Sequence, residues 1–258
     1  EFDNLKSKNF ELFKPECEFT DDSVLTVAVA ETLLNFNPDD EENFKGNLID
    51  IFHKYGELYP DVGYGGHYLS WVEHKHREPY NSCGNGSAMR VSAVGWMFDT
   101  LEETEKVAKI SAEITHNHPE GIKGAQATAA AIWMARNGIS KAEIKGYIEK
   151  TYGYDLDRTW EFLNRNYGWD SSCQGTVPEA IIAFLESTDF EDAIRKAVSM
   201  GGDSDTLACI TGGIAEAFYG EIPEGMVEVT QRVSPPILHK LLDALKSRSS
   251  YGDIVPNR

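Results

Sequence analysis

Apolar residues recur along most of the chain at the three- and four-residue intervals of an amphipathic helix. Val107, Ile110 and Ile114 show this spacing, and no long segment alternates apolar and polar residues as a half-exposed strand does. The pattern predicts helices over residues 22–36, 43–59, 87–101, 102–115, 121–137, 141–151, 177–187, 190–200, 204–219 and 235–247. We therefore expect an all-α fold.

Two of the expected helices are rich in small residues, in the stretches GAQATAAAIWMA and LACITGGIAEAFYG. Small side chains allow close approach between helices, which suits a compact bundle. A chain of 258 residues with 41% hydrophobic residues can bury a sizeable core as one unit. We expect a single domain over residues 1–258, with a loosely packed tail at 247–258.

The formal net charge of −18 disfavours binding to nucleic acid, because such proteins normally carry a basic surface. If this protein binds a diphosphate, metal ions or backbone amides must offset the negative field locally. There is no apolar run of about 20 residues and no basic leader before an apolar stretch. The four cysteines form no CxxC pair, which is typical of free thiols. These features predict a cytoplasmic protein that does not enter a membrane.

Two short acidic segments carry the strongest chemical signal, and each lies at the start of an expected helix. They are TDDS at residues 20–23 and GGDSDT at residues 201–206. Either one alone could be a helix cap. Together they offer an oxygen-only set, whose like charges would repel one another unless cations were shared. Magnesium and manganese prefer such ligands, whereas zinc would require histidine or cysteine. A site for two metal ions is the corresponding hypothesis.

Three further loops contain candidate binding residues. The loop NSCGNGSAMR at 81–90 combines glycines and small polar residues before a helix, which favours an anion site but also suits a plain turn. His116 and His118 lack the partners of a zinc site, so ligand contact or helix capping is the better interpretation. The glycines at 63–66 suit either a loop or a rim close to a ligand.

In their order along the chain, TDDS, SCGNGSAMR, THNHPEGIKGA and GGDSDT resemble the ADP-ribosylglycohydrolase family. This resemblance implies an orthogonal helix bundle with a cleft for two divalent cations, Mg²⁺ or Mn²⁺. The metal ligands that it implies are Thr20, Asp21, Asp22, Asp203, Asp205 and Thr206. It further implies that the diphosphate is cradled by Ser82, Cys83, Gly84, Asn85 and Gly86. His116 would contact the ligand, and residues 63–66, with Tyr64 and Gly65, would line the scissile ribose.

The resemblance implies hydrolysis of the bond between ADP-ribose and an acceptor on a protein or small molecule, with ADP-ribose as the product. A carboxylate would act as general acid or base. Glu1 matches the family glutamate with that role, and Asp21 or Asp22 could substitute for it. One alternative is a catalytically silent member that binds ADP-ribose or is structural. Another is a haloacid-dehalogenase-like phosphatase with Asp203 and Asp205 as its acidic pair, which would need a preceding strand.

The chain departs from the family pattern at its beginning. Family members start with a Gly-Asp-x-x-Gly helix followed by Glu-Phe, but here Glu1 and Phe2 open the sequence, and residues 251–255 resemble the absent element. Truncation, circular permutation and chance similarity are open explanations. If the tail replaces that helix, both termini should lie beside the cleft. The acceptor, the choice between Mg²⁺ and Mn²⁺, and the oligomeric state are also open. Acceptor choice is expected to reside in the loop at 166–173.

Overall fold

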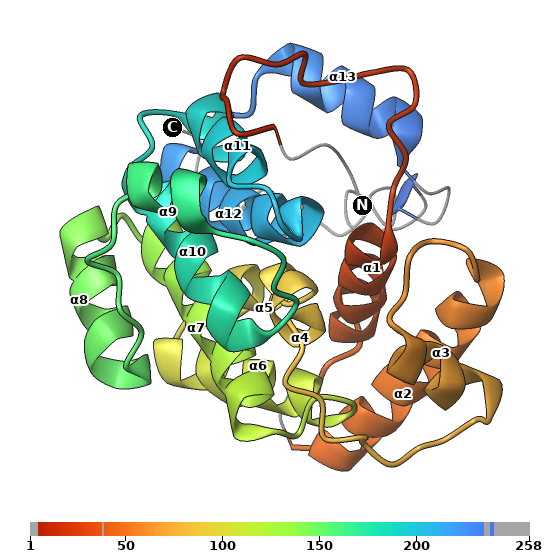
Figure 1. The fold of residues 1–258 in the computed structure, drawn as a ribbon. Helices are drawn as coiled ribbons and strands as arrows, with labels where there is room; N and C mark the ends of the chain where they lie inside the picture. The colour runs from red at the N-terminus through yellow and green to blue at the C-terminus, as the bar shows by residue number, and fades with distance from the viewer. Residues whose placement is uncertain (1–4, 38, 235–237, 240–258) are drawn as a thin grey trace.

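The described part of the chain is built from helices joined by loops (Figure 1), as shown by a computed structural model that describes residues 5–37, 39–234 and 238–239. Its helices are α1 (Asp21–Leu33), α2 (Glu41–Leu58), α3 (Gly66–Glu73), α4 (Gly86–Met89), α5 (Ser92–Met97), α6 (Leu101–Glu113), α7 (Pro119–Arg136), α8 (Lys141–Tyr152), α9 (Trp160–Asn166), α10 (Cys173–Leu185), α11 (Phe190–Ser199), α12 (Ser204–Tyr219) and α13 (Glu224–Val233). Within these residues there is no β-strand, only an isolated bridge between Gly84 and Ser172. The all-α prediction is confirmed.

Helix α7 occupies the centre of the bundle and contacts α4, α5, α6, α8, α10 and α12. Its buried face consists mostly of glycine and alanine, which is why so many helices can approach it closely. At Gly124, an added Cβ would lie 2.4 Å from the sulfur of Cys173 at the start of α10. The small residues singled out in the sequence therefore set the distance between the central helices.

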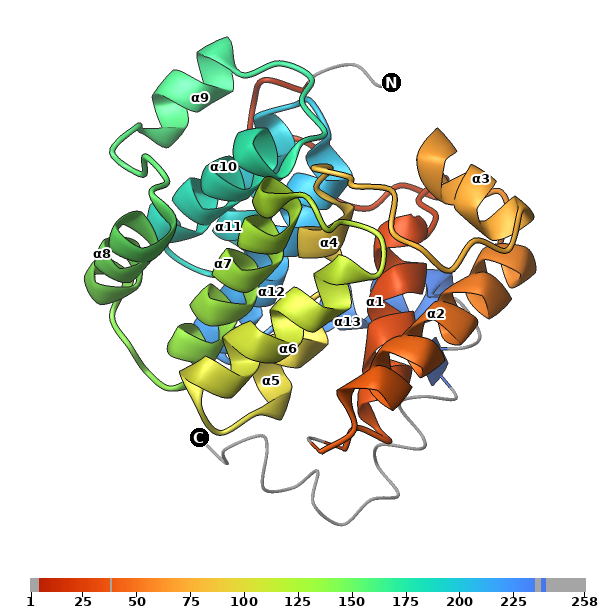
Figure 2. The same cartoon turned by 90° about the horizontal axis from the view of Figure 1, so that it is seen from below.

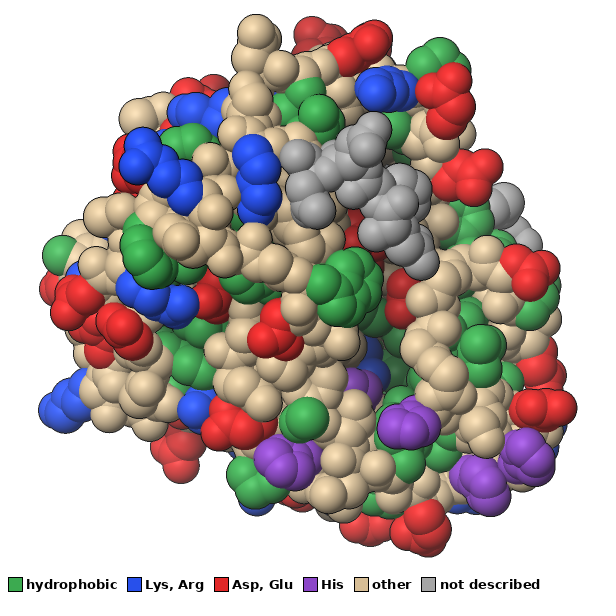
Figure 3. Space-filling view, viewed as in Figure 1, with side chains coloured by type: hydrophobic (Ala, Val, Ile, Leu, Met, Phe, Trp, Pro, Cys, Tyr) green, Lys and Arg blue, Asp and Glu red, His purple; other side chains and the backbone are tan. Residues whose placement is uncertain are grey.

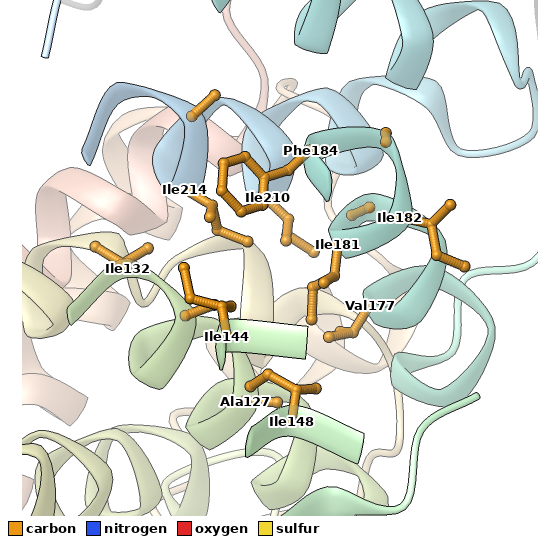
Figure 4. Packing of buried hydrophobic residues seen from close by; sticks show 14 of the residues in the cluster. Ala127, Ile132, Ile144, Ile148, Val177, Ile181, Ile182, Phe184, Ile210 and Ile214 are labelled. Carbon is orange, nitrogen blue, oxygen red and sulfur yellow. The ribbon is translucent and has the colours of Figure 1, made fainter. Parts of the chain in front are cut away.

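Two groups of buried apolar residues lie on either side of this centre. One group joins α1, α2 and α3, which lie on the right of Figure 1, with α6. The other joins α7, α8, α10, α11 and α12, and Figure 4 shows its isoleucines interlocking with Phe184. Seen from below, α6 and α7 run between the two halves (Figure 2). Loops from both groups of helices meet at the cavity described below.

Most expected helices agree with the observed bounds to within a few residues, and the expected helix at 204–219 coincides with α12. The continuous helix expected over 87–101 is wrong. The chain breaks into α4 and α5 at Arg90 and Val91, and it becomes extended at Phe98. The break accompanies burial of the Arg90 side chain, whose guanidinium donates a hydrogen bond to the carbonyl of Ser111 on α6.

Three helices, α3, α9 and α13, were not expected from the sequence. The last two bury few side chains: Leu163 in α9 and Met226 in α13 are their buried residues. A helix with such a narrow buried face gives almost no periodic signal. The helix expected at 235–247 lies outside the described residues except for positions 238 and 239, and the tail at 247–258 lies wholly outside them.

All four cysteines are free thiols, as expected from their spacing. Among the described helices, none is long and apolar enough to cross a membrane.

The close packing between α5 and α7 predicts opposite effects for two Gly→Ala substitutions. At Gly95, a Cβ would lie 2.6 Å from Ile132 and 3.0 Å from the carbonyl of Ala129. We expect Gly95→Ala to lower the free energy of unfolding by about 1–3 kcal/mol through overpacking. Gly146 lies on the exposed face of α8, with no atom near such a Cβ. Gly146→Ala should therefore raise the free energy of unfolding by about 0.5–1 kcal/mol. Chemical denaturation of both variants measures this, and a neutral Gly95→Ala would contradict the predicted overpacking.

Candidate functional site

The loops that separate the predicted helices meet at one cavity of about 510 Å³. Figure 3 shows a hollow near the centre of one face, with acidic, histidine and hydrophobic side chains around it. The cavity is lined by residues from six parts of the chain: 20–25, 62–68, 80–90, His116, 169–171 and 202–206. Segments far apart in the sequence therefore share one site.

The N-terminal end of α1 holds the first acidic pair in the cavity. The backbone N–H of Asp21 donates to the carbonyl of Val62 at 2.9 Å, which fixes the glycine rim against this helix start. Gly63 has a φ of +98°, a conformation that favours glycine, and an added Cβ would lie 3.6 Å from Asp21 Oδ1. The rim at 63–66 therefore begins, at Gly63, directly against Asp21.

Neither acidic segment uses its N-cap side chain as an ordinary cap. Thr20 and Asp203 occupy the N-cap positions of α1 and α12, and neither side chain makes a capping hydrogen bond. Thr20 Oγ1 instead donates to Asp22 Oδ2 at 3.2 Å, and Asp203 Oδ2 accepts from Asn85 Nδ2 at 2.7 Å. Capping by these two side chains therefore does not explain why they are here.

Hydrogen bonding joins the two acidic segments across the fold. Thr206 Oγ1 donates to Asp22 Oδ2 at 3.4 Å, although the two residues are 184 positions apart in the sequence. Asp22 is only 6% exposed, and its other carboxylate oxygen, Oδ1, is buried without a hydrogen-bond partner. A buried carboxylate oxygen that lacks a partner costs free energy, so a ligand for it would be stabilising.

Burial and mutual repulsion raise the pKa values of the carboxyl groups of Asp21, Asp22 and Asp203. Burial, and then the charges of Asp205 and Asp203, raise the pKa of Asp21 to about 7. Burial, followed by the charges of Asp205, Asp21 and Asp203, raises the pKa of Asp22 well above its usual value. Burial also raises the pKa of Asp203 to about 6, against the opposing hydrogen bond from Asn85. The site therefore favours either protons or bound cations.

The residues present fit divalent cations in their chemistry. Carboxylate and hydroxyl oxygens are what Mg²⁺ and Mn²⁺ prefer, and Asp22 Oδ1 is a buried oxygen that lacks a partner. No group of three or more His, Cys, Asp or Glu side chains in the described part of the chain stands ready to hold a metal ion. The fit to a divalent cation therefore rests on the type of ligand atoms and on the unpartnered Oδ1 of Asp22, and not on a set of ligands already arranged around a metal position.

The loop at 82–86 is held in place against the start of α10. The backbone N–H of Asn85 donates to the carbonyl of Ser171 at 2.8 Å, and that of Cys173 donates to the carbonyl of Cys83 at 2.9 Å. The side chain of Asn85 donates to Thr176 Oγ1 at 3.0 Å as well as to Asp203. Asn85 therefore connects the loop to the second acidic segment.

His116 faces the same loop from the end of α6. An added Cβ at Gly86 would lie 3.2 Å from His116 Nε2, so glycine keeps the space in front of this ring open. His116 Nδ1 lies 2.8 Å from Thr115 Oγ1, which also accepts from the buried guanidinium of Arg90 at 2.9 Å. Burial, and secondarily the charge of Arg90, lowers the pKa of His116 well below its usual value. The ring is therefore neutral at neutral pH.

The structure places most of the predicted site residues on the cavity wall. Those that line it are Thr20, Asp21, Asp22, Gly65, Ser82, Gly84, Asn85, Gly86, His116, Asp203, Asp205 and Thr206. Tyr64 is buried behind the wall and lies near enough to Asp21 for that charge to raise its pKa, after burial itself. Cys83 is half-buried, and its carbonyl accepts the hydrogen bond from the N–H of Cys173 at the start of α10. Glu1 and residues 251–255 lie outside the described residues.

Several wall residues were not predicted individually, although Trp169 and Ser171 belong to the loop at 166–173 that was expected to choose the acceptor. They are His67 and Tyr68 of α3, Tyr80 and Arg90 near the glycine loop, and Trp169 and Ser171 in the loop before α10. Arg90 ends the SCGNGSAMR motif, so its position was a usable signal. Trp169 is 64% exposed and carries no periodic pattern that would mark it.

Comparisons with known proteins agree with this arrangement. The sequence model of the ADP-ribosylglycohydrolase family matches residues 3–252. ADP-ribosylhydrolase ARH3 of Mus musculus is 26% identical over 270 residues, covering 80% of this chain and 71% of that protein. The Homo sapiens ARH3 is 27% identical over 270 residues, with 80% and 72% covered. An uncharacterized protein of Archaeoglobus fulgidus is 31% identical over 228 residues, with 82% and 75% covered.

A solved structure described as an ADP-ribosylglycohydrolase-related protein complex shares the fold, with a TM-score of 0.64 at 22% identity over 93% of this chain and 90% of that one. The helical fold of this chain is therefore one that is known from a solved structure. The chain belongs to the ADP-ribosylglycohydrolase family. Membership and the ARH3 relatives indicate an ADP-ribosyl hydrolase. The phosphatase alternative is disfavoured, because helix α11 rather than a strand precedes Asp203.

The raised pKa of Asp21 predicts how stability depends on pH without divalent cations. A carboxyl whose pKa is about 7 in the folded state contributes stability at low pH, and that contribution is lost as the pH rises from about 4 through about 7. Asp21→Asn should therefore raise the free energy of unfolding by about 1–3 kcal/mol at pH 8, and by much less near pH 4. Denaturation in chelator across this range measures the difference. The same change at exposed Asp157 is the control, and a pH-independent gain at Asp21 would contradict the prediction.

Proposed function

We propose that this protein is a metal-dependent hydrolase that cleaves the glycosidic bond between ADP-ribose and an acceptor and releases ADP-ribose. The observation that carries the proposal is the meeting of the two acidic segments around Asp22. Thr20 and Thr206 both donate to its Oδ2, while its Oδ1 has no partner. Family membership supplies the substrate class, and the geometry supplies the reason for a cation.

The residues that would hold two divalent cations are Thr20, Asp21, Asp22, Asp203, Asp205 and Thr206. Bound Mg²⁺ or Mn²⁺ would neutralise the carboxylates and supply Lewis-acid polarisation of ribose hydroxyls or water. The protein's own part is to keep these oxygens together despite their repulsion. Asn85 does this for Asp203 by donating to Oδ2, and the buried start of α1 does it for Asp21 and Asp22.

The loop at 82–86 is the proposed contact for the diphosphate. In a chain with a net charge of −18, an anion needs local donors, and backbone amides beside glycine provide them without added charge. Gly84 and Gly86 keep the space before His116 open. Because His116 is neutral, it can donate one ring N–H to an oxygen of the ligand without adding a charge. The fully buried Arg90 holds Thr115, and through it His116, in place.

Hydrolysis requires that the bond from the ribose anomeric carbon to the acceptor breaks and that a water oxygen takes its place. The water gives up one proton, and the leaving acceptor gains one. Asp21 and Asp22 both line the cavity, so their carboxyl groups are placed to take part in such a proton exchange. We propose Asp21 or Asp22 for this role among the described residues. Glu1, the family counterpart of a general base, stays a prediction because it lies outside them.

The acceptor side of the reaction is proposed to involve the loop at 166–173. Its Trp169 lines the cavity with most of its indole exposed. An arginine, a serine, a base or a small metabolite would each use the same ribose-binding core, so released ADP-ribose should be measured with a panel of ADP-ribosylated acceptors. Binding of ADP-ribose without release from any acceptor would instead indicate a silent member of the family.

Substitution of a proposed metal ligand should abolish turnover without unfolding the protein. We expect Asp205→Asn to lower the rate of ADP-ribose release by about a hundredfold or more, because a cation could no longer be held correctly. Mg²⁺ or Mn²⁺ should raise the melting temperature of the unaltered chain by mass action, and less so for the variant. Asp50→Asn, at an exposed ion pair on α2, is the matched control. Near-normal turnover by Asp205→Asn would contradict the proposed ligand set.

A larger side chain at Gly84 should separate ligand binding from metal binding. An added Cβ there would lie 3.1 Å from Ser82 Oγ and 3.6 Å from His116 Nε2, so the branches of valine would enter the proposed diphosphate space. We expect Gly84→Val to weaken ADP-ribose binding at least about tenfold, the equivalent of one lost hydrogen bond to a charged group. Calorimetry should show Mg²⁺ affinity little changed. Equal loss of both affinities would point to general disruption of the fold instead.

A further inference from the structure

Lys6 lies beside two loops that form the wall of the cavity, although it is far from them in the sequence. Its Nζ donates to the carbonyl of Tyr167 at 2.8 Å and to the carbonyl of Met200 at 2.5 Å. Tyr167 is the C-cap of α9, and Met200 is the C-cap of α11. One ammonium group therefore binds the C-terminal ends of two helices at once.

This placement is favourable for two physical reasons. The last carbonyls of a helix have no partner within it, so a lysine can satisfy them. The C-terminal end of α11 also carries partial negative charge, and Met200 keeps helical backbone angles, so its carbonyl presents that charge to the ammonium. Tyr167 is extended and offers a loop carbonyl that follows α9. The contact with Met200 is partly buried, which reduces screening by solvent.

The two helix ends lead directly into the functional site. The chain after Tyr167 contributes Trp169 and Ser171 to the cavity, and the chain after Met200 contributes Gly202, Asp203 and Asp205. These segments also touch: an added Cβ at Gly202 would lie 2.5 Å from the carbonyl of Gly168. Movement of one loop would therefore be transmitted to the other.

The segment that carries Lys6 is fastened to α11. Arg195 Nη1 donates to the carbonyls of Lys8 and Phe10 at 3.0 Å and 2.8 Å, and Lys8 pairs with Asp192 at 2.7 Å. In Figure 1 this segment starts beside α11 and runs across the top of the view to α1, where Thr20 begins the other acidic segment. Lys6 thus belongs to a segment that connects the two acidic parts of the site. We call its two hydrogen bonds to Tyr167 and Met200 the tie.

We propose that Lys6 is a positioning residue, which holds the 167–171 and 201–205 loops together so that the second acidic segment and Trp169 keep their places around the cavity. It touches neither substrate nor cation and acts through the carbonyls of Tyr167 and Met200. The link to catalysis rests on the proposed function, whereas the tie itself does not.

Three variants of the full chain test the tie. Lys6→Met removes the ammonium and retains most of the apolar stem, Lys6→Arg keeps a cationic donor, and Lys8→Met removes a neighbouring charge whose partner, Asp192, still has Lys196 at 2.6 Å. Hydrogen exchange without metal is measured at 167–172 and 200–205, and Mg²⁺ and Mn²⁺ binding is measured by calorimetry.

We expect Lys6→Met to speed exchange in both loops and to weaken cation affinity about three- to tenfold, as loss of a partly exposed charged hydrogen bond would. Lys6→Arg should restore both properties, and Lys8→Met, which leaves the Arg195 contacts of the segment in place, should change both much less than Lys6→Met does. Unchanged exchange in the two loops of Lys6→Met would overturn the proposal. Faster exchange throughout the chain, or equal effects from Lys8→Met, would also overturn it. If the unaltered chain binds neither cation, the proposed function fails, and loop exchange alone still decides the role of Lys6.

Discussion

Carboxylates from opposite ends of the chain share one cavity, and their mutual repulsion is the constraint to which the surrounding structure responds. Asp21 and Asp22 start α1, while Asp203 and Asp205 start α12, and the pKa values of the first three are raised. Held apart, each pair would be an ordinary acidic helix start. Held together, they destabilise the folded state at neutral pH until protons or cations compensate.

The compensation within the protein is partial and comes from neutral donors. Asn85, Thr20 and Thr206 donate to these carboxylates, and no lysine or arginine forms an ion pair with them among the described residues. Arg90 also lines the cavity, but the hydrogen bonds from its Nη2 go to Ser111 and Thr115. An internal salt bridge would have stabilised the site but would also have occupied the oxygens. Leaving Asp22 Oδ1 without a partner keeps it available to a ligand.

The sequence predicted the helices with broad apolar faces and missed those without them. Helix α12 was predicted to its last residue because leucine, isoleucine and alanine repeat along its buried side. Helix α9 buries little more than Leu163, so its propensity had no pattern to reinforce it. The break at Arg90 could not be predicted from local sequence, because it depends on acceptors twenty or more residues away, Ser111 on α6 and Thr115 just after it.

The sequence predicted the site residues that belong to a recognisable motif. It did not single out residues that reach the site only through tertiary contacts. Acidic residues at helix starts and glycines in a loop are visible in the sequence, whereas Trp169 and Lys6 gain meaning only from what the fold brings beside them. The same distinction explains Tyr64, which neighbours a lining glycine but points its ring toward Tyr68, with ring centres 4.6 Å apart, inside the core.

The separation of 184 residues between Asp22 and Thr206 has a consequence for how the protein is made. During synthesis the first acidic pair leaves the ribosome long before its partner exists, so α1 must pack against α2 and α5 with its aspartates still facing water. Closing so long a loop carries an entropic cost that is recovered only when α12 docks. Nascent or prematurely terminated chains would therefore contain much of the first core group but not the assembled cluster of carboxylates.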